Sequence, residues 1–380
     1  MRIAFTFATL ALAAIPPLAA QRTDYFVFVA AEAADRISLV RFSPDAPGGP
    51  AARVEREMPI GLLPTGPDGP HGLAVSPDGR FLFVSTAHGN PNGYLWKLDA
   101  RTGRPLGRTE LGRFPATLQL TPDGAFAFVV NFNLHGDPVP SSVSVVATDS
   151  MLELARIPTC VMPHGSRLNP QGTRQYSACM MDDLVVEIDA RTFEVARSFR
   201  VAGGSEQGFA GLPPRQGPAP PLHSPRATHH APSCSPTWVQ PSADGARLYV
   251  ACNKSNQILE LDTETWRVSR RFPAGDGVYN LAVTRDGRLL LATNKRGRSV
   301  SVFDLATGRE AARVETIRRV VHGVAVSPDD RYAFVSVEGI GSEPGTVEIV
   351  DLGARARVAA VDVGQMAGGI DFWKTEPAPR

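Results

Sequence analysis

Three histidines occupy the same position of a repeated sequence unit and could act together. His71, His164 and His322 each open a short apolar run that leads into a tight turn, and Tyr279 takes this position in another copy. Imidazole nitrogens bind zinc or copper, transfer protons near neutral pH and form hydrogen bonds with polar ligands. If the fold gathers these positions around one axis, the sequence predicts a ligand site there. The sharper hypothesis is a zinc or copper site held by the three histidines.

The repeated unit decides where these residues lie. In its clearest copy, residues 70–103, three alternating apolar runs are separated by turns rich in proline, glycine and aspartate, which is typical of a β-meander. The turn residues of six copies step by 45, 48, 73, 42 and 43 positions: Asp78, Asp123, Gln171, Asp244, Asp286 and Asp329. A period in the low forties with about four strands per unit is the spacing of propeller blades.

The two ends of the chain complement one another. Residues 367–372 look like the first strand of a seventh unit, and residues 25–29, 37–40 and 52–54 look like its other three strands. Pairing them would close a ring and remove exposed sheet edges. The expected fold is therefore all-β: a seven-bladed β-propeller of four-stranded antiparallel blades, closed by pairing the C-terminal strand with the N-terminal strands.

The first 20 residues have the features of a secretory signal peptide, with a short basic start, an apolar middle and small residues before an expected cut after Ala20. The apolar run is too short to span a bilayer comfortably, which disfavours a membrane anchor. We therefore expect a signal peptide at 1–20, a single propeller domain at 21–380, a periplasmic or secreted location and no membrane span. A net charge of +1 gives no electrostatic reason to expect a nucleic-acid partner.

One segment, residues 202–232, departs from the repeat. It is rich in glycine, proline and serine and has no hydrophobic period, so we expect a loop inserted between two blades. Two interpretations stay open. The segment is either a neutral surface excursion or a flap over one face, since it carries His223, His229 and His230.

Propeller topology places the histidines and cysteines on one face. The innermost strand of each blade begins on the face where the second strand ends, and its expected opening residues are His71, Ala116, His164, Ser235, Tyr279, His322 and Gly368. Asn294 and Asp182 lie beyond the ends of second strands on the same face. These positions predict a ligand-binding set: His71, His164, Tyr279, His322, Asn294 and Asp182.

Two further readings of this face remain open. Asp182, Asp183 and Glu338 are candidates for acid–base work, although acidic residues at loop tips are more often solvated. Alternatively, the centre of the ring is polar by necessity, and histidine serves there as a half-buried hydrogen-bonding residue.

The four cysteines of an exported chain favour disulfides, and four cysteines allow three pairings. We favour the within-blade pairs Cys160 with Cys179 and Cys234 with Cys252, and Cys160 with Cys234 is the competing pair. Cys179 with Cys252 is disfavoured because packed sheets lie ~10 Å apart, which exceeds the reach of a disulfide. A free Cys179 beside Met180 would instead resemble a soft copper site.

The sequence also carries Ser-Pro-Asp-Gly-Arg-Phe-Leu-Phe-Val at 76–84, Tyr-Val-Ala-Cys-Asn at 249–253 and Val-Ser-Val-Phe-Asp at 300–304. These units resemble the YVTN-repeat β-propellers, a lactonase-like and nitrite-reductase haem d1-like family, over essentially the whole chain after the signal peptide. The resemblance implies the propeller fold. It implies no residue roles, because the family's repeat motif records how blades are built and no catalytic motif of its enzymes matches here.

No nucleophile elbow, phosphate-binding loop, zinc-protease motif or haem-attachment motif occurs in the sequence. We therefore favour an exported binding or interaction protein that takes a small molecule or a protein at its His/Cys-bearing face, rather than an enzyme. A metal-dependent (copper or zinc) or lactonase-like enzyme that uses the same face is the alternative. A purely structural envelope component is the third hypothesis.

Overall fold

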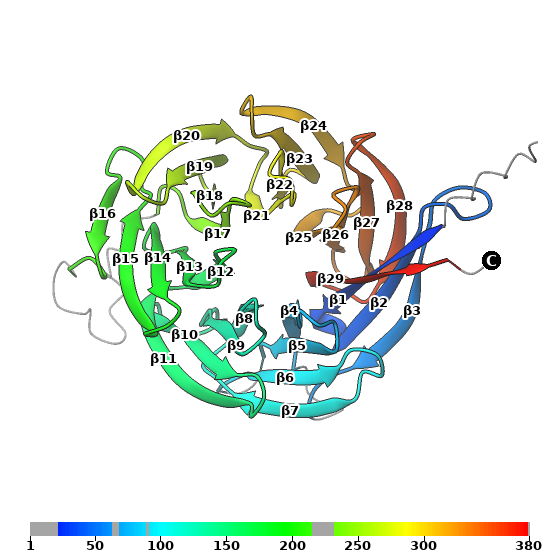
Figure 1. The fold of residues 1–380 in the computed structure, drawn as a ribbon, viewed down its shortest axis with the longest axis horizontal. Helices are drawn as coiled ribbons and strands as arrows, with labels where there is room; N and C mark the ends of the chain where they lie inside the picture. Colours follow the sequence, from blue (N-terminus) through cyan, green and yellow to red (C-terminus); the bar gives the residue numbers. More distant parts are fainter. Residues whose placement is uncertain (1–21, 63–67, 89–90, 215–231, 379–380) are drawn as a thin grey trace, which may run out of the picture.

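A computed structural model describes residues 22–62, 68–88, 91–214 and 232–378. These residues form seven antiparallel sheets arranged radially around one axis (Figure 1). The expected all-β, seven-bladed propeller is therefore confirmed. Within the described ranges the helical structure is one 3-10 turn, η1 (Glu32–Ala34), and no helix is both long and apolar enough to cross a bilayer.

The strands of each blade follow one another from the axis outward. From the innermost strand of each blade, they are β29 (Ala367–Pro377), β1 (Thr23–Ala31), β2 (Arg36–Ser43) and β3 (Ala51–Pro59); β4 (Pro70–Val75), β5 (Phe81–Thr86), β6 (Tyr94–Asp99) and β7 (Pro105–Glu110); β8 (Pro115–Leu120), β9 (Phe126–Asn131), β10 (Pro140–Ala147) and β11 (Leu152–Val161); β12 (Pro163–Leu168), β13 (Arg174–Cys179), β14 (Leu184–Asp189), β15 (Glu194–Arg200) and β16 (Gln207–Ala210); β17 (Pro236–Pro241), β18 (Arg247–Cys252), β19 (Gln257–Asp262) and β20 (Arg267–Pro273); β21 (Val278–Val283), β22 (Leu289–Asn294), β23 (Ser299–Asp304) and β24 (Arg309–Glu315); and β25 (Val320–Val326), β26 (Tyr332–Glu338), β27 (Gly345–Asp351) and β28 (Ala356–Val363).

The repeated turn motif has a direct structural cause. Ser76 donates a hydrogen bond of 2.6 Å from its hydroxyl to Asp78, and the same carboxylate oxygen accepts the Arg80 N–H at 3.0 Å. Gly79 adopts a φ of 70°, which a residue with a side chain rarely takes. The same hydroxyl-to-aspartate bond recurs in four further blades: Thr121–Asp123, Ser242–Asp244, Thr284–Asp286 and Ser327–Asp329.

The chain ends close the ring as expected. Strand β29 pairs antiparallel with β1, and Val27 lies opposite Phe372. The rings of Tyr25 and Phe372 lie 6.5 Å apart between centroids, and the Tyr25 hydroxyl donates a hydrogen bond of 2.7 Å to Asp329 in the neighbouring blade. We call the sheet of β29, β1, β2 and β3 the closure blade.

Neighbouring blades approach closely at glycines of the innermost strands. A Cβ on Gly72 would lie 2.1 Å from the Ala116 carbonyl oxygen, and a Cβ on Gly369 would lie 2.1 Å from the carbonyl oxygen of His71. Hydroxyl side chains of second strands bridge the same gap. Ser85, for example, accepts the Gly72 N–H at 2.8 Å and donates to the Ala116 carbonyl at 2.6 Å. These contacts fix the height at which each innermost strand begins.

Part of the inserted segment is structured, which corrects the expectation of a loop throughout 202–232. Strand β16 pairs with β15 and gives that blade a fifth strand. The reason is local, because Gly208 lies against the indole of Trp266 in the next blade, where a side chain would clash. His223, His229 and His230 lie outside the described residues.

Candidate functional site

The predicted axial residues converge at one end of the ring. The innermost strands begin at this end, and we call it the histidine end because it holds the three axial histidines. The ring of His71 lies 6.2 Å from that of His164 and 5.5 Å from that of His322 between centroids. Tyr279 completes the circle, 5.3 Å from His164 and 4.9 Å from His322. Residues from four blades therefore form one aromatic cluster on the axis.

His164 is fully buried and uses both ring nitrogens. Its Nδ1 donates to the carbonyl of Thr237 at 2.9 Å, so Nε2 accepts the hydroxyl of Tyr279 at 3.0 Å. Burial, with a smaller contribution from the charge of His71, lowers the pKa of His164 to about 3. Burial also raises the pKa of the Tyr279 hydroxyl. At neutral pH this pair is therefore an uncharged hydrogen-bond unit.

Glu32 is a site residue that sequence reasoning missed. It lies in η1 of the closure blade, and its carboxylate accepts hydrogen bonds of 2.6 Å from both His71 Nδ1 and His88 Nε2. Burial would raise its pKa, but the charges and hydrogen bonds of the two histidines outweigh burial and hold the pKa of Glu32 well below its usual range. A signal for it existed, because η1 follows the second strand of the closure blade and such loops face the histidine end.

A second charged group borders His322. The ammonium of Lys295 lies 3.2 Å from Glu338 and 4.4 Å from the centre of the Tyr279 ring, and Glu338 lies 3.8 Å from His322 Nε2. Burial, with the nearby charge of Lys295, lowers the pKa of His322 well below its ordinary value. Burial disfavours the charged form of Lys295 and would lower its pKa. Tyr279 and Glu338 outweigh burial, so the pKa is raised.

Two buried ring nitrogens in this cluster are left over. His71 Nε2 and His322 Nδ1 form no hydrogen bond of good geometry with a described residue, although the backbone of Gly368 interacts with His322. Leaving such a group unsatisfied costs about 1–3 kcal/mol. Within the described ranges, no three His, Cys, Asp or Glu side chains are arranged to hold a metal ion. The His164 nitrogens, both engaged in hydrogen bonds, are one reason.

The opening position of the β17 blade was assigned incorrectly. The residue paired at the level of His164 and Tyr279 is Thr237, not Ser235, because Pro236 pairs with Cys252 as Pro163 pairs with Cys179. Thr237 lies seven positions before the turn residue Asp244, the spacing found for the three axial histidines, so the sequence held the correct answer.

The remaining predicted residues lie away from the axial cluster. Asn294 is buried and donates hydrogen bonds of 3.0 Å and 2.9 Å to Ser299 and Ser301, within its own blade. Asp182 accepts the Val161 N–H at 2.8 Å. These hydrogen bonds join each side chain to a nearby strand.

An aromatic layer extends from the axis toward the rim. Phe114 packs edge-on against His71, His88 and His135, with centroid distances of 5.6, 5.1 and 5.4 Å. His88 and His135 are stacked at 5.6 Å. The side chain of His88 is 30% exposed, and that of Lys295 is 29% exposed. These two side chains connect the buried cluster with the surface, and we call them the rim residues.

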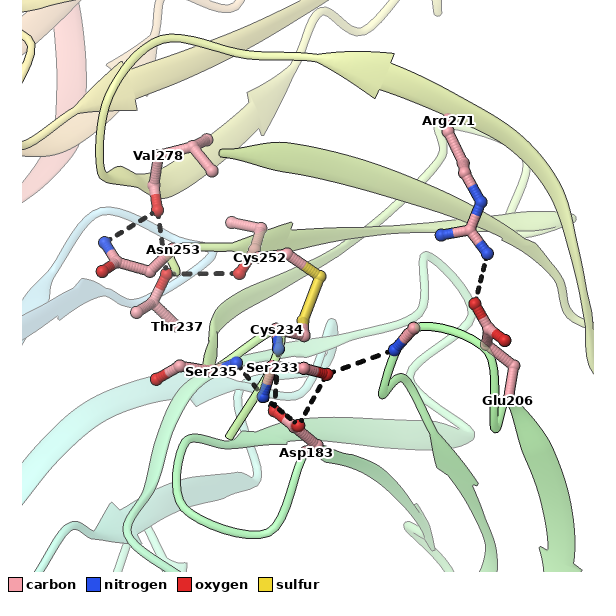
Figure 2. Close-up of a disulfide and its surroundings, with 12 residues drawn as sticks. Asp183, Glu206, Ser233, Cys234, Ser235, Thr237, Cys252, Asn253, Arg271 and Val278 are labelled. Carbon is pink, nitrogen blue, oxygen red and sulfur yellow. Dashed lines mark hydrogen bonds and ion pairs between the residues drawn. A yellow bond between two sulfur atoms is a disulfide. The ribbon is translucent and has the colours of Figure 1, made fainter. Parts of the chain in front are cut away.

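Both favoured disulfides are present, Cys160–Cys179 and Cys234–Cys252. Figure 2 shows the second of them. No cysteine is free, so a copper site with a free Cys179 thiolate is wrong. Figure 2 also shows Asp183 beneath the chain that leads into β17, where it accepts the N–H groups of Ser233, Cys234 and Ser235 at 2.6, 3.2 and 2.7 Å. Asp183 is thus a structural cap rather than an acid–base group.

The fold and the axial cluster together define a seven-bladed β-propeller with a polar, imidazole-lined end. No family model and no curated protein sequence matches the chain. Among solved structures, it is similar to the hydrazine synthase of Kuenenia stuttgartiensis, with a TM-score of 0.58 and 22% identity over 78% of this chain and 82% of the other.

Two further solved structures are similar. A functionally unknown protein from Desulfotomaculum acetoxidans gives a TM-score of 0.62 and 16% identity over 92% of this chain and 98% of that one. The propeller domain of Cps50 (Swd1) from Myceliophteria thermophila gives 0.57 and 15% over 80% and 88%. At these identities the likeness shows the fold alone.

Proposed function

We propose that this chain is an exported binding protein that receives a small molecule or a protein partner at the histidine end. The observation that carries the proposal is the unsatisfied Nε2 of His71, buried at the centre of a network whose other side, Nδ1, is held by Glu32. Unsatisfied buried polar atoms in a native structure call for an explanation. A ligand that hydrogen-bonds this nitrogen would supply it.

The rim supports the same proposal. His88 and Lys295 are partly exposed, and both connect with the buried cluster, His88 through Glu32 and Lys295 through Tyr279 and Glu338. A partner that touches these two side chains would therefore change the electrostatics of the axial residues. Pre-arranged polar groups of this kind fix the orientation of a ligand.

The alternative, a zinc- or copper-dependent enzyme, is favoured by one observation. The two unpartnered nitrogens, His71 Nε2 and His322 Nδ1, belong to rings only 5.5 Å apart between centroids. A third nitrogen from His164 would require Tyr279 to give up its hydrogen bond. We therefore rank metal chemistry below ligand binding.

Ligand-observed NMR with a library of small polar molecules tests the proposal. Wild type is compared with His88→Gln and Lys295→Met, and Arg288→Gln, which removes an exposed arginine in the turn that precedes β22, is the control. At least one compound should bind wild type and the control but lose its signal with both rim variants. If every bound compound ignores the rim variants, the proposal fails. Stoichiometric zinc or copper that His71→Ala and His322→Ala both abolish would favour the enzyme instead.

A further inference from the structure

The opposite end of the axis holds a cavity. This cavity has a volume of about 650 Å³ and is lined by the ends of the innermost strands and the turns that follow them, so we call this side the turn end. A smaller cavity of about 220 Å³ shares Arg167, Gln240 and Asp371 with it. None of the three axial histidines lines either cavity.

One layer of side chains forms the floor of this space. Its residues lie three positions after those of the histidine layer, and all of them line one or both cavities: Ala74, Gln119, Arg167, Gln240, Ala282, Ala325 and Asp371. In ring order, Ala74 separates Asp371 from Gln119, and Ala282 with Ala325 separates Gln240 from Asp371. Because the alanines are small, they leave room between the polar groups, whereas the histidine layer is filled by aromatic rings.

Arg167 is held in place but is not saturated. Its guanidinium lies 4.4 Å over the ring of Trp238, and Nη1 donates to the carbonyl of Ser166 at 2.9 Å. Nε and Nη2 have no hydrogen-bond partner among the described residues. Burial lowers the pKa of Arg167 to about 10, so that the group remains charged at neutral pH. A planar guanidinium with one free edge is suited to bind a carboxylate through two parallel hydrogen bonds.

Asp371 offers the complementary charge in the same cavity. Its two carboxylate oxygens accept the N–H groups of Val75 at 2.8 Å and Phe372 at 2.9 Å, and each keeps a further lone pair. Burial raises the pKa of Asp371 above its ordinary value, and the N–H of Val75 and the nearby charge of Arg167 offset part of this rise. Arg167 and Asp371 interact through their charges, and no salt bridge within 4 Å joins them in the described part of the chain. Both side chains therefore face the cavity, which Arg285 also lines.

The two glutamines of the floor layer also supply one hydrogen-bond donor and one acceptor. Gln119 accepts the Leu168 N–H with Oε1 at 2.5 Å, which leaves its amide N–H group as a donor beside Arg167. Gln240 donates from Nε2 to the carbonyl of Pro241 at 3.1 Å, which leaves Oε1 as an acceptor. The cavity thus combines donors suited to an anionic group with acceptors suited to a cationic one.

We infer that the turn end is a second binding site, which takes a small zwitterion bearing a carboxylate and an ammonium group, the chemical class of the free amino acids. The carboxylate binds Arg167 and the ammonium binds Asp371. The alanine positions accommodate the carbon skeleton between the two charges. This site is independent of the ligand proposed for the histidine end, from which the floor layer separates it.

Calorimetric titration with glycine, β-alanine and γ-aminobutyrate tests the inference, because these probes carry the same two charges at increasing separation. Propionate and propylamine supply single-charge comparisons. At least one zwitterion should bind about tenfold more tightly than both single-charge compounds. Its affinity should fall about tenfold or more in Arg167→Gln and in Asp371→Asn. Arg288→Gln and His88→Gln should bind as wild type does.

If Arg167→Gln fails to fold, a packing variant still tests the inference. Ala282→Leu fills the floor and removes no charge, so it should weaken zwitterion binding as well. The inference is overturned if none of the three zwitterions binds at about 10 mM. It is also overturned if propionate binds as tightly as they do, or if folded charge variants bind normally. Loss of binding in His88→Gln would transfer the site to the histidine end.

Discussion

The imidazole of His71 lies 5.5 Å from that of His322 between ring centroids, in a T-shaped arrangement, although the closure blade stands between their two blades in the ring. The closure blade contributes Gly368 at the same level, and a Cβ there would lie 3.7 Å from the His322 ring, an ordinary contact. The closure blade therefore places no large side chain between the two imidazoles.

Removal of His164 should make the free energy of unfolding depend less on pH below 6.5. Its folded pKa of about 3 lies below the ordinary value of 6.5, so the unfolded chain takes up a proton that the folded chain refuses. Stability from this group is thus lost as pH falls below 6.5, by on the order of 3 kcal/mol at about pH 4. Urea unfolding of wild type and His164→Gln across this range measures the difference. The exposed-histidine control His135→Gln should follow wild type, and parallel profiles for wild type and His164→Gln would refute the prediction.

Glu32→Gln should destabilise the protein more at about pH 6 than at about pH 9. The hydrogen bond to Glu32 raises the pKa of His88, so the stability of this ion pair is present below the ordinary value of 6.5 and is lost as pH rises through the raised pKa. Breaking a buried pair costs about 3 kcal/mol. Unfolding free energies of both proteins at the two pH values test this. An equal loss at both would show that the pair is not charged in the folded state.

Gly369→Ala should disrupt the contact between the closure blade and its neighbour. The new Cβ would meet the carbonyl oxygen of His71 at 2.1 Å, where backbone must shift. We expect a loss of about 2–3 kcal/mol, seen as a lower denaturation midpoint. Gly203→Ala is the matched control, because nothing lies within 4 Å of a Cβ there. A similar effect of both substitutions would show that the close approach is unimportant.

Serine at both positions of either disulfide should cost about 3 kcal/mol, since the linked residues are 19 and 18 positions apart. Thermal unfolding of C160S/C179S and C234S/C252S measures the loss of stability. Reduction of the wild type should cost the sum of the two losses. Peptide mapping without reductant is the independent control. A peptide that joins Cys160 to Cys234 would contradict the pairing.

Much of the architecture follows from the sequence because the turn motif has a local cause. The hydroxyl-to-aspartate bond and the glycine recur in most of the turns, with Asp330 in place of the glycine in one, so the period and the ring closure are readable. The residues opening six innermost strands were also placed correctly. The β17 blade was misaligned by two residues, since Ser235 was chosen although Thr237 has the repeated spacing from its turn.

The chemistry was less readable because partners come from different blades. Glu32 accepts from His71 and His88 of the neighbouring blade, and no local motif marks it. Arg167 and Asp371 lie in two different blades and share a cavity only through the floor layer. Even so, their position three residues beyond the predicted opening residues could have been listed in advance from the repeat.

The closure blade has a consequence for biosynthesis. Its inner strand, β29, begins at Ala367, whereas the strands that it completes lie near the start of the chain. A ribosome must therefore translate almost the entire message before the first and last sheets can meet. Until then, β1 presents an unpaired edge and a set of large aromatic side chains, so prematurely terminated products should be substrates for chaperones and proteases.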